Sequence, residues 1–278
     1  MAENQNSKDL YMIIKEKYQR KSVAGQLQSV FGKEIYHYSC LESTNKVAYL
    51  LAKKGAEEGT VVVADEQTQG EGRGDHYWYS PQGGLWFSLI LRPRMIASET
   101  SRLSILGATG IAMSIDRLFS SLKVRIRWPN DVVIKDKKVA GVLIKVRAER
   151  SDVNFAIMGI GVNLNVREFP SPLSFIATSL IKETGDPISK KRFLECTLEE
   201  LENLYFSSQV NGHMLLEKAR LFSSLLGRQV EVITTEGKFQ GLVQDLDEDG
   251  GLILRLESGL HKKILPEEGY IKERSPKI

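Results

Sequence analysis

Four short polar clusters of the sequence carry residue types that could bind and activate a charged small molecule. The first is Ser43, Thr44 and Asn45, which stand where a strand-like pattern changes into a helix-like one. One such residue would suffice as a helix cap, because its side-chain oxygen accepts a hydrogen bond from a free N–H group of the first turn. Three in a row exceed that need, so a helix cap and a ligand-binding set both stand as interpretations.

The second cluster is a loop in which Gly70, Gly72 and Gly74 surround Glu71 and Arg73. Glycine lets a backbone approach an anion closely, and a guanidinium group can clamp a carboxylate or a phosphate. The loop is not a P-loop, because no Gly-Lys-Ser/Thr follows it. It is not the dinucleotide fingerprint either, because a tryptophan-rich strand follows instead of a helix. Taken alone, the segment fits a surface hairpin equally well.

The third cluster spans two predicted strands joined by a basic turn. Asn130 and Asp131 follow one apolar run, and Lys138 and Gly141 belong to the next. A hairpin of this kind would bring an amine, an amide and a carboxylate together. The amine could neutralise charge on a transferred phosphoryl or acyl phosphate group, and Asp131 could orient the lysine or hold Mg²⁺. A bare Pro-Asn-Asp is otherwise only a turn.

The fourth cluster is the run GIGVNLN, which follows an apolar strand pattern. Gly159 and Gly161 would let a ligand pass close to the backbone. Asn163 offers both a hydrogen-bond donor and an acceptor. This run therefore predicts a further piece of a ligand pocket.

Regular elements of two periodicities must position these clusters. Alternating or glycine-bounded apolar runs predict strands, and apolar residues three or four positions apart predict helices. The mixture indicates an α+β fold with a mixed or antiparallel sheet. The predicted strands cover about residues 34–39, 59–67, 83–91, 124–134, 137–148 and 153–166, and the predicted helices cover about residues 43–55, 98–121, 188–208 and 212–225.

The pattern changes after Gly227 to short strands separated by Glu-Gly, Asp-Gly and Ser-Gly turns. Such a segment is typical of a small SH3-like β-barrel. We therefore divide the chain into an N-terminal helical extension at 1–32, a main domain at 33–225 and a C-terminal β domain at 226–278. The extension is too short for a DNA-binding domain of three helices.

The composition narrows the class of protein. Hydrophobic residues make up 42% and charged residues 26% of the chain, as in ordinary globular proteins. A net charge of +3 is too weak to argue for nucleic acid. Cys40 and Cys196 lie far apart and predict neither a metal pair nor a disulfide framework. Because no apolar run approaches about 18 residues and no signal peptide is evident, we expect a cytoplasmic protein that binds neither nucleic acid nor membrane.

In order and spacing, the motifs STN, EQTQGEGR followed by Trp78 and Ser80, GLWFSL, WPND, KKVAGVLI and GIGVNLN resemble those of biotin–protein ligases, also named biotin–(acetyl-CoA-carboxylase) ligases. The similarity covers about residues 33–275, and the short N-terminus resembles the archaeal-type branch without a DNA-binding domain, whose members are often homodimers. The resemblance implies a catalytic domain like that of class II synthetases and biotin–lipoate ligases, with an SH3-like C-terminal domain. It further implies that ATP and biotin, with Mg²⁺, give biotinyl-5′-AMP. The biotinyl group would then pass to a lysine of a biotin carboxyl carrier domain, which is expected to dock by strand addition at a sheet edge.

The resemblance also assigns roles to residues of this sequence. Lys138, Arg73 and Asp131 would be catalytic, with Asp131 as the Mg²⁺ contact. Trp86 and Leu143 would wall the apolar part of biotin. The implied biotin contacts are Ser43, Thr44, Asn45, Gln67, Gly70, Glu71, Gly72, Arg73, Lys138, Gly141, Gly159 and Gly161, and the implied ATP or phosphate contacts are Arg73, Arg127, Asn130, Asp131, Lys138 and Asn163.

Two positions depart from the pattern of that family. Glu71 stands where the loop often carries the first of two arginines, so a carboxylate replaces a cation. Lys145 stands where a glutamate often follows the glycine-containing strand. The glycine loop with Arg73 is expected to be a lid that becomes ordered over biotin and biotinyl-5′-AMP, with the tryptophan-rich strand as its rigid wall.

Two alternative functions remain. A lipoate or octanoate–protein ligase would share the broad fold, but a lipoyl ring has no use for the hydrogen-bonding set Ser43, Thr44 and Gln67. A biotin-sensing regulator would have to place its DNA-binding part within residues 1–32.

Overall fold

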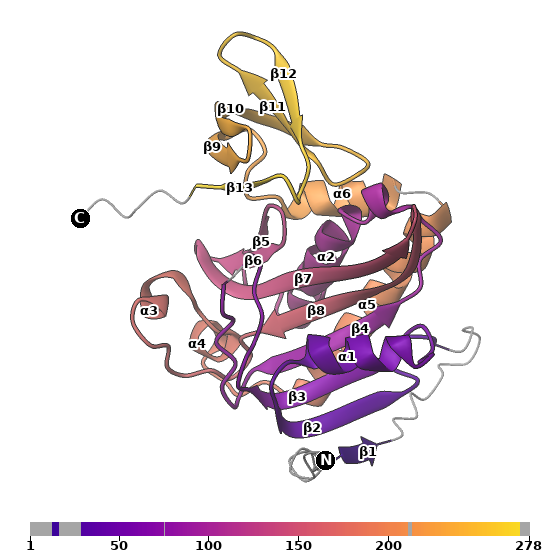
Figure 1. Cartoon of the computed structure of the whole chain (residues 1–278). Helices are drawn as coiled ribbons and strands as arrows, with labels where there is room; N and C mark the ends of the chain where they lie inside the picture. The colour runs from indigo at the N-terminus through magenta and orange to yellow at the C-terminus, as the bar shows by residue number, and fades with distance from the viewer. Residues whose placement is uncertain (1–12, 17–28, 75, 211–212, 273–278) are drawn as a thin grey trace, which may run out of the picture.

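An eight-stranded sheet forms the frame of the main domain (Figure 1). The computed structural model describes residues 13–16, 29–74, 76–210 and 213–272. The strand order is β1-β2-β3-β4-β8-β7-β6-β5, and the sheet is mixed, because β2 and β3 are parallel whereas the other paired strands are antiparallel. The strands are β1 (Ile13–Glu16), β2 (Ile35–Leu41), β3 (Val61–Gln67), β4 (Leu85–Leu91), β5 (Val124–Arg127), β6 (Asp131–Ile134), β7 (Lys137–Glu149) and β8 (Asp152–Val162).

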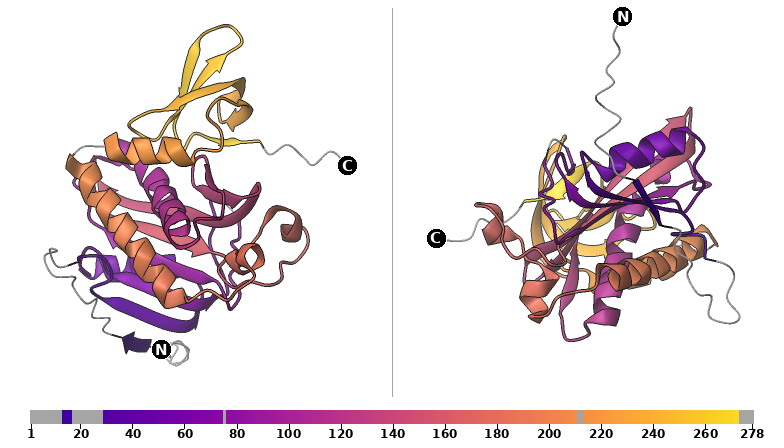
Figure 2. Two further views of the ribbon diagram at one scale, coloured as in Figure 1. Left: turned by 180° about the vertical axis from the view of Figure 1, so that it is seen from behind. Right: turned by 90° about the horizontal axis from the view of Figure 1, so that it is seen from below.

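Helices cover both faces of this sheet. On one face α1 contacts β3, β4 and β8, and on the other α2 contacts β7 while α5 and α6 pack against α2. The right-hand view of Figure 2 shows α1 and α5 on opposite sides of the strands. The helices are α1 (Thr44–Lys53), η2 (Ala97–Glu99), α2 (Arg102–Leu118), α3 (Leu173–Ile176), α4 (Leu180–Thr184), α5 (Lys190–Val210) and α6 (His213–Phe222).

The central strand β4 shows why the run LWFSLIL is almost wholly apolar. Successive side chains of a strand point to opposite faces, so Phe87 and Leu89 enter the large core on the α2 side and Ile90 enters a smaller core beneath α1. All seven residues of β4 are buried. Ser88 is the polar exception, and its hydroxyl faces the start of α1.

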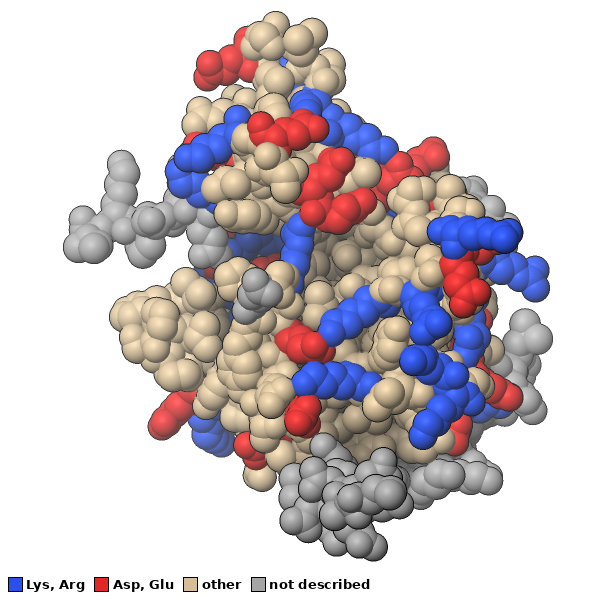
Figure 3. Space-filling view, in the orientation of Figure 1, with Lys and Arg blue, Asp and Glu red and all other residues tan. Residues whose placement is uncertain are grey.

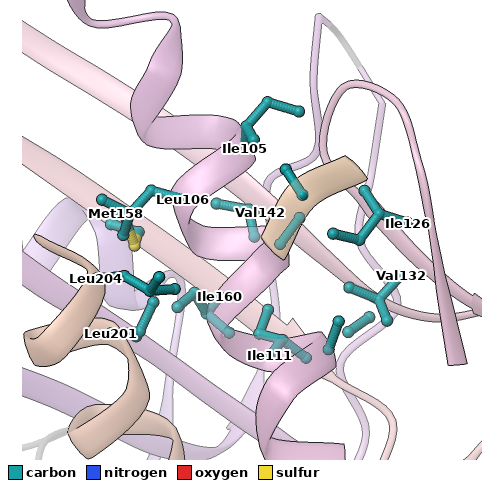
Figure 4. Packing of buried hydrophobic residues seen from close by; sticks show 14 of the residues in the cluster. Ile105, Leu106, Ile111, Ile126, Val132, Val142, Met158, Ile160, Leu201 and Leu204 are labelled. Carbon is teal, nitrogen blue, oxygen red and sulfur yellow. The ribbon is translucent and has the colours of Figure 1, made fainter. Parts of the chain in front are cut away.

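The larger core lies between the sheet and α2 (Figure 4). Ile111 of α2 and Leu201 of α5 are both fully buried there, with Val142 and Met158 contributed by the strands. Burying a large aliphatic side chain contributes about 1.5–3 kcal/mol relative to leaving it in water. This core therefore holds β7 and β8 firmly in place, and these two strands carry Lys138 and the glycines of the site described below.

The C-terminal segment forms a second, antiparallel sheet with the order β12-β11-β10-β9-β13, at the top of Figure 1. The indole of Trp128 donates to the carbonyl of Gly250 at 2.8 Å, and Arg220 pairs with Asp245 at 2.6 Å. Apolar residues of the module, including Val243, belong to the same core as the main domain. The predicted β module is confirmed. Its strands are β9 (Gln229–Thr234), β10 (Gly237–Leu246), β11 (Leu252–Leu256), β12 (His261–Ile264) and β13 (Gly269–Ile271).

The predicted N-terminal helix is wrong where the structure describes that segment. Ile13–Glu16 form β1, which pairs with β2 from Tyr38 to Ile35. Without β1, the backbone groups of β2 would form an unpaired sheet edge, and their pairing outweighs local helix propensity. The rest of the predicted helix, at 1–12 and 17–28, lies outside the described residues, and the domain boundaries stay predictions.

The predicted strand at 124–134 is divided into β5 and β6. Pro129 has no N–H group and cannot continue a strand ladder. Asn130 follows it, and its side-chain amide donates to the carbonyl of Val142 at 2.7 Å, which fixes the turn. The short helices α3 and α4 were not predicted. Among the described residues, no helix has the length and apolar character needed to span a membrane.

Candidate active site

The four polar clusters converge on the face of the sheet that carries α1. In the registers of β6, β7 and β8, Asp131 lies opposite Gly141, and Gly141 lies opposite Gly161. Gly161 in turn lies opposite Trp86 of β4. The third and fourth predicted clusters are therefore cross-strand neighbours, and both lie beside the tryptophan-rich strand β4.

The site glycines create a floor on which other side chains lie directly. A Cβ atom at Gly159 would stand 2.2 Å from Oδ1 of Asn45, and one at Gly161 would stand 2.4 Å from Nε1 of Trp78. At Gly141 the ring of Trp78 would be 3.0 Å away. Any other residue at 159 or 161 would therefore displace Asn45 or Trp78, because real Cβ atoms do not approach other atoms so closely.

A buried hydrogen-bond network stands at one end of this floor. The backbone N–H of Thr44 donates to Oε1 of Gln67 at 2.8 Å, and the Gln67 amide donates to Ser80 at 2.9 Å. The Ser88 hydroxyl lies 2.8 Å from Oγ1 of Thr44 and 2.7 Å from Oδ1 of Asn45. Each of these polar residues is less than 9% exposed. Buried groups aligned in this way present a fixed set of donors and acceptors to a ligand.

Ser43 belongs to the site rather than to a helix cap. It occupies the N-cap position of α1, yet its hydroxyl makes no capping hydrogen bond among the described residues. The hydroxyl instead donates to Oε2 of Glu71 at 2.8 Å. Oε1 of the same carboxylate accepts a hydrogen bond from Nζ of Lys145 at 2.5 Å. Burial alone would raise the pKa of Glu71, but hydrogen bonds from Lys145 and Ser43 outweigh it and hold this pKa below its usual value.

The glycine loop is a β-hairpin. Gly72 donates to the carbonyl of His76 at 2.7 Å, and Trp78 donates to the carbonyl of Gly70 at 2.9 Å. Near its tip, the guanidinium of Arg73 donates to the carbonyl of Pro266 in the C-terminal module. The surface-hairpin interpretation is thus correct for the backbone. The expected change from disorder to order over a ligand stays a prediction.

Arg73, Lys138 and Asp131 form the charged end of the site. Nζ of Lys138 lies 2.6 Å from the Asp131 carboxylate. Burial lowers the pKa of Arg73, while the charges of Asp131 and Glu267 act in the opposite direction. Guanidinium groups stay protonated under such conditions. Two cations therefore stand beside the two carboxylates of Asp131 and Glu267, and both cations are positioned to turn toward an anionic ligand.

Trp78 belongs to the family motif, but the sequence assigned it no role in the site. Its ring lies on Gly141 and Gly161, Nζ of Lys138 stands 4.8 Å from the ring centroid, and the ring of Trp86 packs edge-on at 6.5 Å. The indole nitrogen is buried and has no hydrogen-bond partner within the part of the chain that the structure describes. A buried unpaired donor costs about 1–3 kcal/mol. A ligand acceptor, or a rotation of the ring, would remove this cost.

Three predicted phosphate or adenine contacts have their side-chain donors engaged in loop structure. The Asn130 amide donates to Val142, Nη2 of Arg127 donates to the carbonyl of Asp136 at 3.1 Å, and the Asn163 amide donates to the carbonyl of Thr178 at 3.0 Å. Arg127 lies opposite Asp131 in the β5–β6 register. These residues border the site, and their ligand contacts stay predictions.

An open cleft of about 450 Å³ separates the hairpin from β7. Leu143 and Lys145 form the β7 wall, and the hairpin wall includes Glu71 and Tyr77. Figure 3 shows this side of the molecule with lysine and arginine side chains interspersed among aspartate and glutamate. The cleft is large enough for a small molecule, and it opens beside the Glu71–Lys145 ion pair.

Comparison with known proteins assigns the family. Residues 36–163 match the biotin/lipoate A/B protein ligase family, and residues 225–265 match the biotin protein ligase C-terminal domain. The chain is 34% identical over 242 residues to the bifunctional ligase/repressor BirA of Bacillus subtilis, covering 86% of this chain and 74% of that protein. The chain belongs to the biotin protein ligase family. The family predicted from the ordered motifs is therefore confirmed.

Two further relatives agree with this family. The biotin–(acetyl-CoA-carboxylase) ligase of Paracoccus denitrificans is 29% identical over 230 residues, covering 81% of this chain and 95% of that protein. The solved biotin protein ligase from Aquifex aeolicus, in complex with biotin and ATP, superposes with a TM-score of 0.76 at 29% identity and covers 86% of this chain and 99% of that one. The predicted fold class of a biotin protein ligase, with its C-terminal SH3-like module, is confirmed.

Proposed function

We propose that this chain activates biotin with ATP and attaches the biotinyl group to a lysine of a biotin carboxyl carrier domain. A biotin carboxylate oxygen attacks the α-phosphorus of ATP, which forms biotinyl-5′-AMP and releases pyrophosphate. The lysine amine then attacks the acyl carbon, which forms an amide and releases AMP. The observation that carries this proposal is a glycine floor with a neutral hydrogen-bonding network at one end and the Lys138 and Arg73 cations at the other. Biotin has the same arrangement of groups, with a neutral ureido ring at one end and a negatively charged carboxylate at the other.

The neutral end suits the ureido group. Thr44 and Gln67 are buried and hydrogen-bonded to each other, Ser88 donates to Thr44, and the buried Ser43 beside them donates to Glu71. Asn45 positions this set through Ser88. The Trp78 ring lies on Gly161 in this structure, so its rotation would expose Gly161, beside Gly159, as the floor for the biotin ring, and Trp86 and Leu143 would flank it.

The charged end suits the reacting groups. A carboxylate and a phosphate repel each other as they approach, and cations between them lower that barrier. Lys138, held by Asp131 at 2.6 Å, and Arg73 are the cations positioned for this task. Arg127, Asn130 and Asn163 would contact ATP after exchanging a loop hydrogen bond for one to the nucleotide.

Mg²⁺ would be held mainly by the nucleotide. No group of three or more histidine, cysteine, aspartate or glutamate residues suited to a metal occurs in the described part of the chain. Mg²⁺ commonly uses one or two carboxylates together with substrate phosphates and water. Asp131 is the carboxylate that fits this mode here. The ion would supply charge neutralisation of the phosphates, while Lys138 and Arg73 act on the reacting oxygen atoms.

The carrier domain is expected to dock beside the cleft, where its lysine could reach the adenylate. Cytoplasmic location and a homodimer remain part of this proposal. A lipoate ligase is the second candidate, because the family that matches residues 36–163 includes lipoate ligases. The buried set around Gln67 favours biotin, since a lipoyl ring would leave those groups unpaired.

The test uses purified protein with biotin, ATP and Mg²⁺. We expect biotin-dependent exchange of labelled pyrophosphate into ATP, followed by transfer of labelled biotin to a carrier domain. Thermal stabilisation by biotin but not by lipoate would exclude the second candidate. Folded protein that supports neither exchange nor transfer would contradict the proposal.

A further inference from the structure

The two positions that depart from the family's sequence pattern touch each other. Glu71 lies on the glycine hairpin and Lys145 lies on β7, and their charged atoms are 2.5 Å apart. Their side chains are 26% and 39% exposed, so the pair is partly shielded from solvent. In the pattern that the motifs resemble, the loop often carries a cation and the strand a glutamate, whereas this chain has Glu71 and Lys145 at these positions.

The ion pair joins three elements of the site. Through the Glu71 carboxylate, Lys145 on β7 is connected to Ser43 at the start of α1, because Oε2 of Glu71 accepts the Ser43 hydroxyl at 2.8 Å. Ser43 is only 1% exposed. The hairpin is thus held to the sheet at the neutral end of the floor, while Arg73 holds its tip to the C-terminal module.

Lys145 is the cation that dominates at Glu71. Lys46 also lies near enough to act on the carboxylate through its charge, but Nζ of Lys46 is bonded to Glu42 at 2.9 Å and to Gln69 at 2.8 Å. Without Lys145, the Glu71 carboxylate would stand partly buried beside Ser43 with a weaker counter-charge. Such a group favours an open hairpin, in which water solvates it.

We propose that Glu71 and Lys145 are a charge-reversed closure pair that positions the glycine hairpin over the neutral end of the site, with Lys145 acting through Glu71 and Ser43. This inference rests on the proposed function for its ligand. Lys145 is a positioning residue, since its amine is bonded to the Glu71 carboxylate at the wall of the cleft and acts on the hairpin through that carboxylate. The pair should slow the escape of biotin and biotinyl-5′-AMP.

Charge-reversal variants test the pair. The single variants Lys145→Glu and Glu71→Arg each place like charges together, and the double variant Glu71→Arg/Lys145→Glu restores an opposite pair. Arg147→Glu is the matched control, because Arg147 lies two positions along β7, has a similar side-chain exposure of 38%, and pairs only loosely with Glu149 at 3.8 Å. The conservative variant Lys145→Gln serves if a reversed charge prevents folding.

Two readouts are needed. The first is the rate at which biotinyl-5′-AMP leaves the protein, together with the KM values for biotin and ATP. The second is the rate of chymotrypsin cleavage near Tyr77, which is 59% exposed on the hairpin and reports hairpin opening without any ligand. We expect each single variant to release the adenylate about threefold to tenfold faster, as for coupled neighbouring residues. The biotin KM should rise more than the ATP KM, and cleavage should accelerate.

The double variant should return both rates to within about threefold of the unmodified protein, and Arg147→Glu should leave them unchanged. Equal effects in the singles and the double, or no effect in the singles or in Lys145→Gln, would overturn the closure pair. Failure of the proposed function is distinguishable from failure of the closure pair. If the proposed function is wrong, the unmodified protein will form no adenylate, while the cleavage rates will still show whether the pair closes the hairpin.

Discussion

Replacement of Lys138 by alanine removes the cation placed to receive charge from the reacting carboxylate and phosphate. Nζ of Lys138 lies 2.6 Å from Asp131, and the side chain is 31% exposed. Two unit charges about 4 Å apart interact by about 4 kcal/mol at an effective dielectric constant of about 20. Because solvent reaches about a third of this side chain, we take about 3 kcal/mol as the loss in the transition state. Since about 1.4 kcal/mol is a factor of ten in rate, adenylation should slow by about 10²-fold.

The assay is the initial rate of biotin-dependent pyrophosphate exchange at saturating ATP. Lys137→Ala is the matched control, because Lys137 is the preceding residue of β7 and is exposed. It should retain the unmodified rate. The double variant Lys138→Ala/Asp131→Asn separates a missing cation from an unpaired carboxylate, and we expect it to stay slow. An exchange rate within about threefold of normal in Lys138→Ala, or recovery in the double variant, would refute the role of this lysine.

Four further changes have defined outcomes. Gly161→Ala places a Cβ atom 2.4 Å from Trp78. Because overpacking costs about 1–3 kcal/mol, calorimetry should show that the variant binds biotin about tenfold more weakly. An unchanged Kd for biotin would contradict the glycine floor. Arg73→Gly should release biotinyl-5′-AMP about tenfold faster in a chase experiment. The variant removes the contact between the hairpin tip and the C-terminal module, and it also removes a cation that would bind the adenylate. The Glu71 pKa is lowered in the folded protein, so its ion pair stabilises the fold above the unfolded pKa of about 4.3 and loses that contribution as pH falls through the lower folded value. The stability difference between the unmodified protein and Glu71→Gln should accordingly be constant from about pH 5 to 8 and shrink below about pH 4. Leu201→Ala should lower the free energy of unfolding in urea by about 2–5 kcal/mol, because Leu201 is fully buried against α2; a loss under about 1 kcal/mol would mean that this core repacks.

The elements with strong periodicity were predictable from the sequence. The pattern of α2, with Leu103, Leu106 and Ile111 on one side, corresponds to residues that are at most 1% exposed. The all-apolar β4 corresponds to a central strand covered on both faces. These predictions succeeded because burial of one helix face, or of both strand faces, leaves a direct pattern in the residue order.

Tertiary pairing decided the elements that the sequence did not predict. Ile13–Glu16 have a helix-compatible local pattern, but the open edge of β2 makes a strand of them. The run at 124–134 has strand character throughout, yet the turn at Pro129 folds it back on itself. In both cases the outcome depends on a partner strand that is distant in the chain or on a turn that the periodicity does not show.

The site was predictable as a set of motifs but not as a set of contacts. The motif order assigned the family and brought Lys138 to Asp131, as expected from the hairpin. The role of Trp78 could not be predicted, because only the structure shows that its ring occupies the space that Gly161 leaves free. The pairing of Glu71 with Lys145 required the placement of the hairpin against β7, because 74 residues separate the two in sequence.

A crystal structure of the unmodified protein grown with biotin, ATP and Mg²⁺ tests the central claim most directly. The account predicts biotinyl-5′-AMP on the floor formed by Gly159 and Gly161, with the ureido group at Ser43 and Gln67 and the phosphate at Lys138. Density for the adenylate anywhere else, or a ureido group bonded to other residues, would contradict the account.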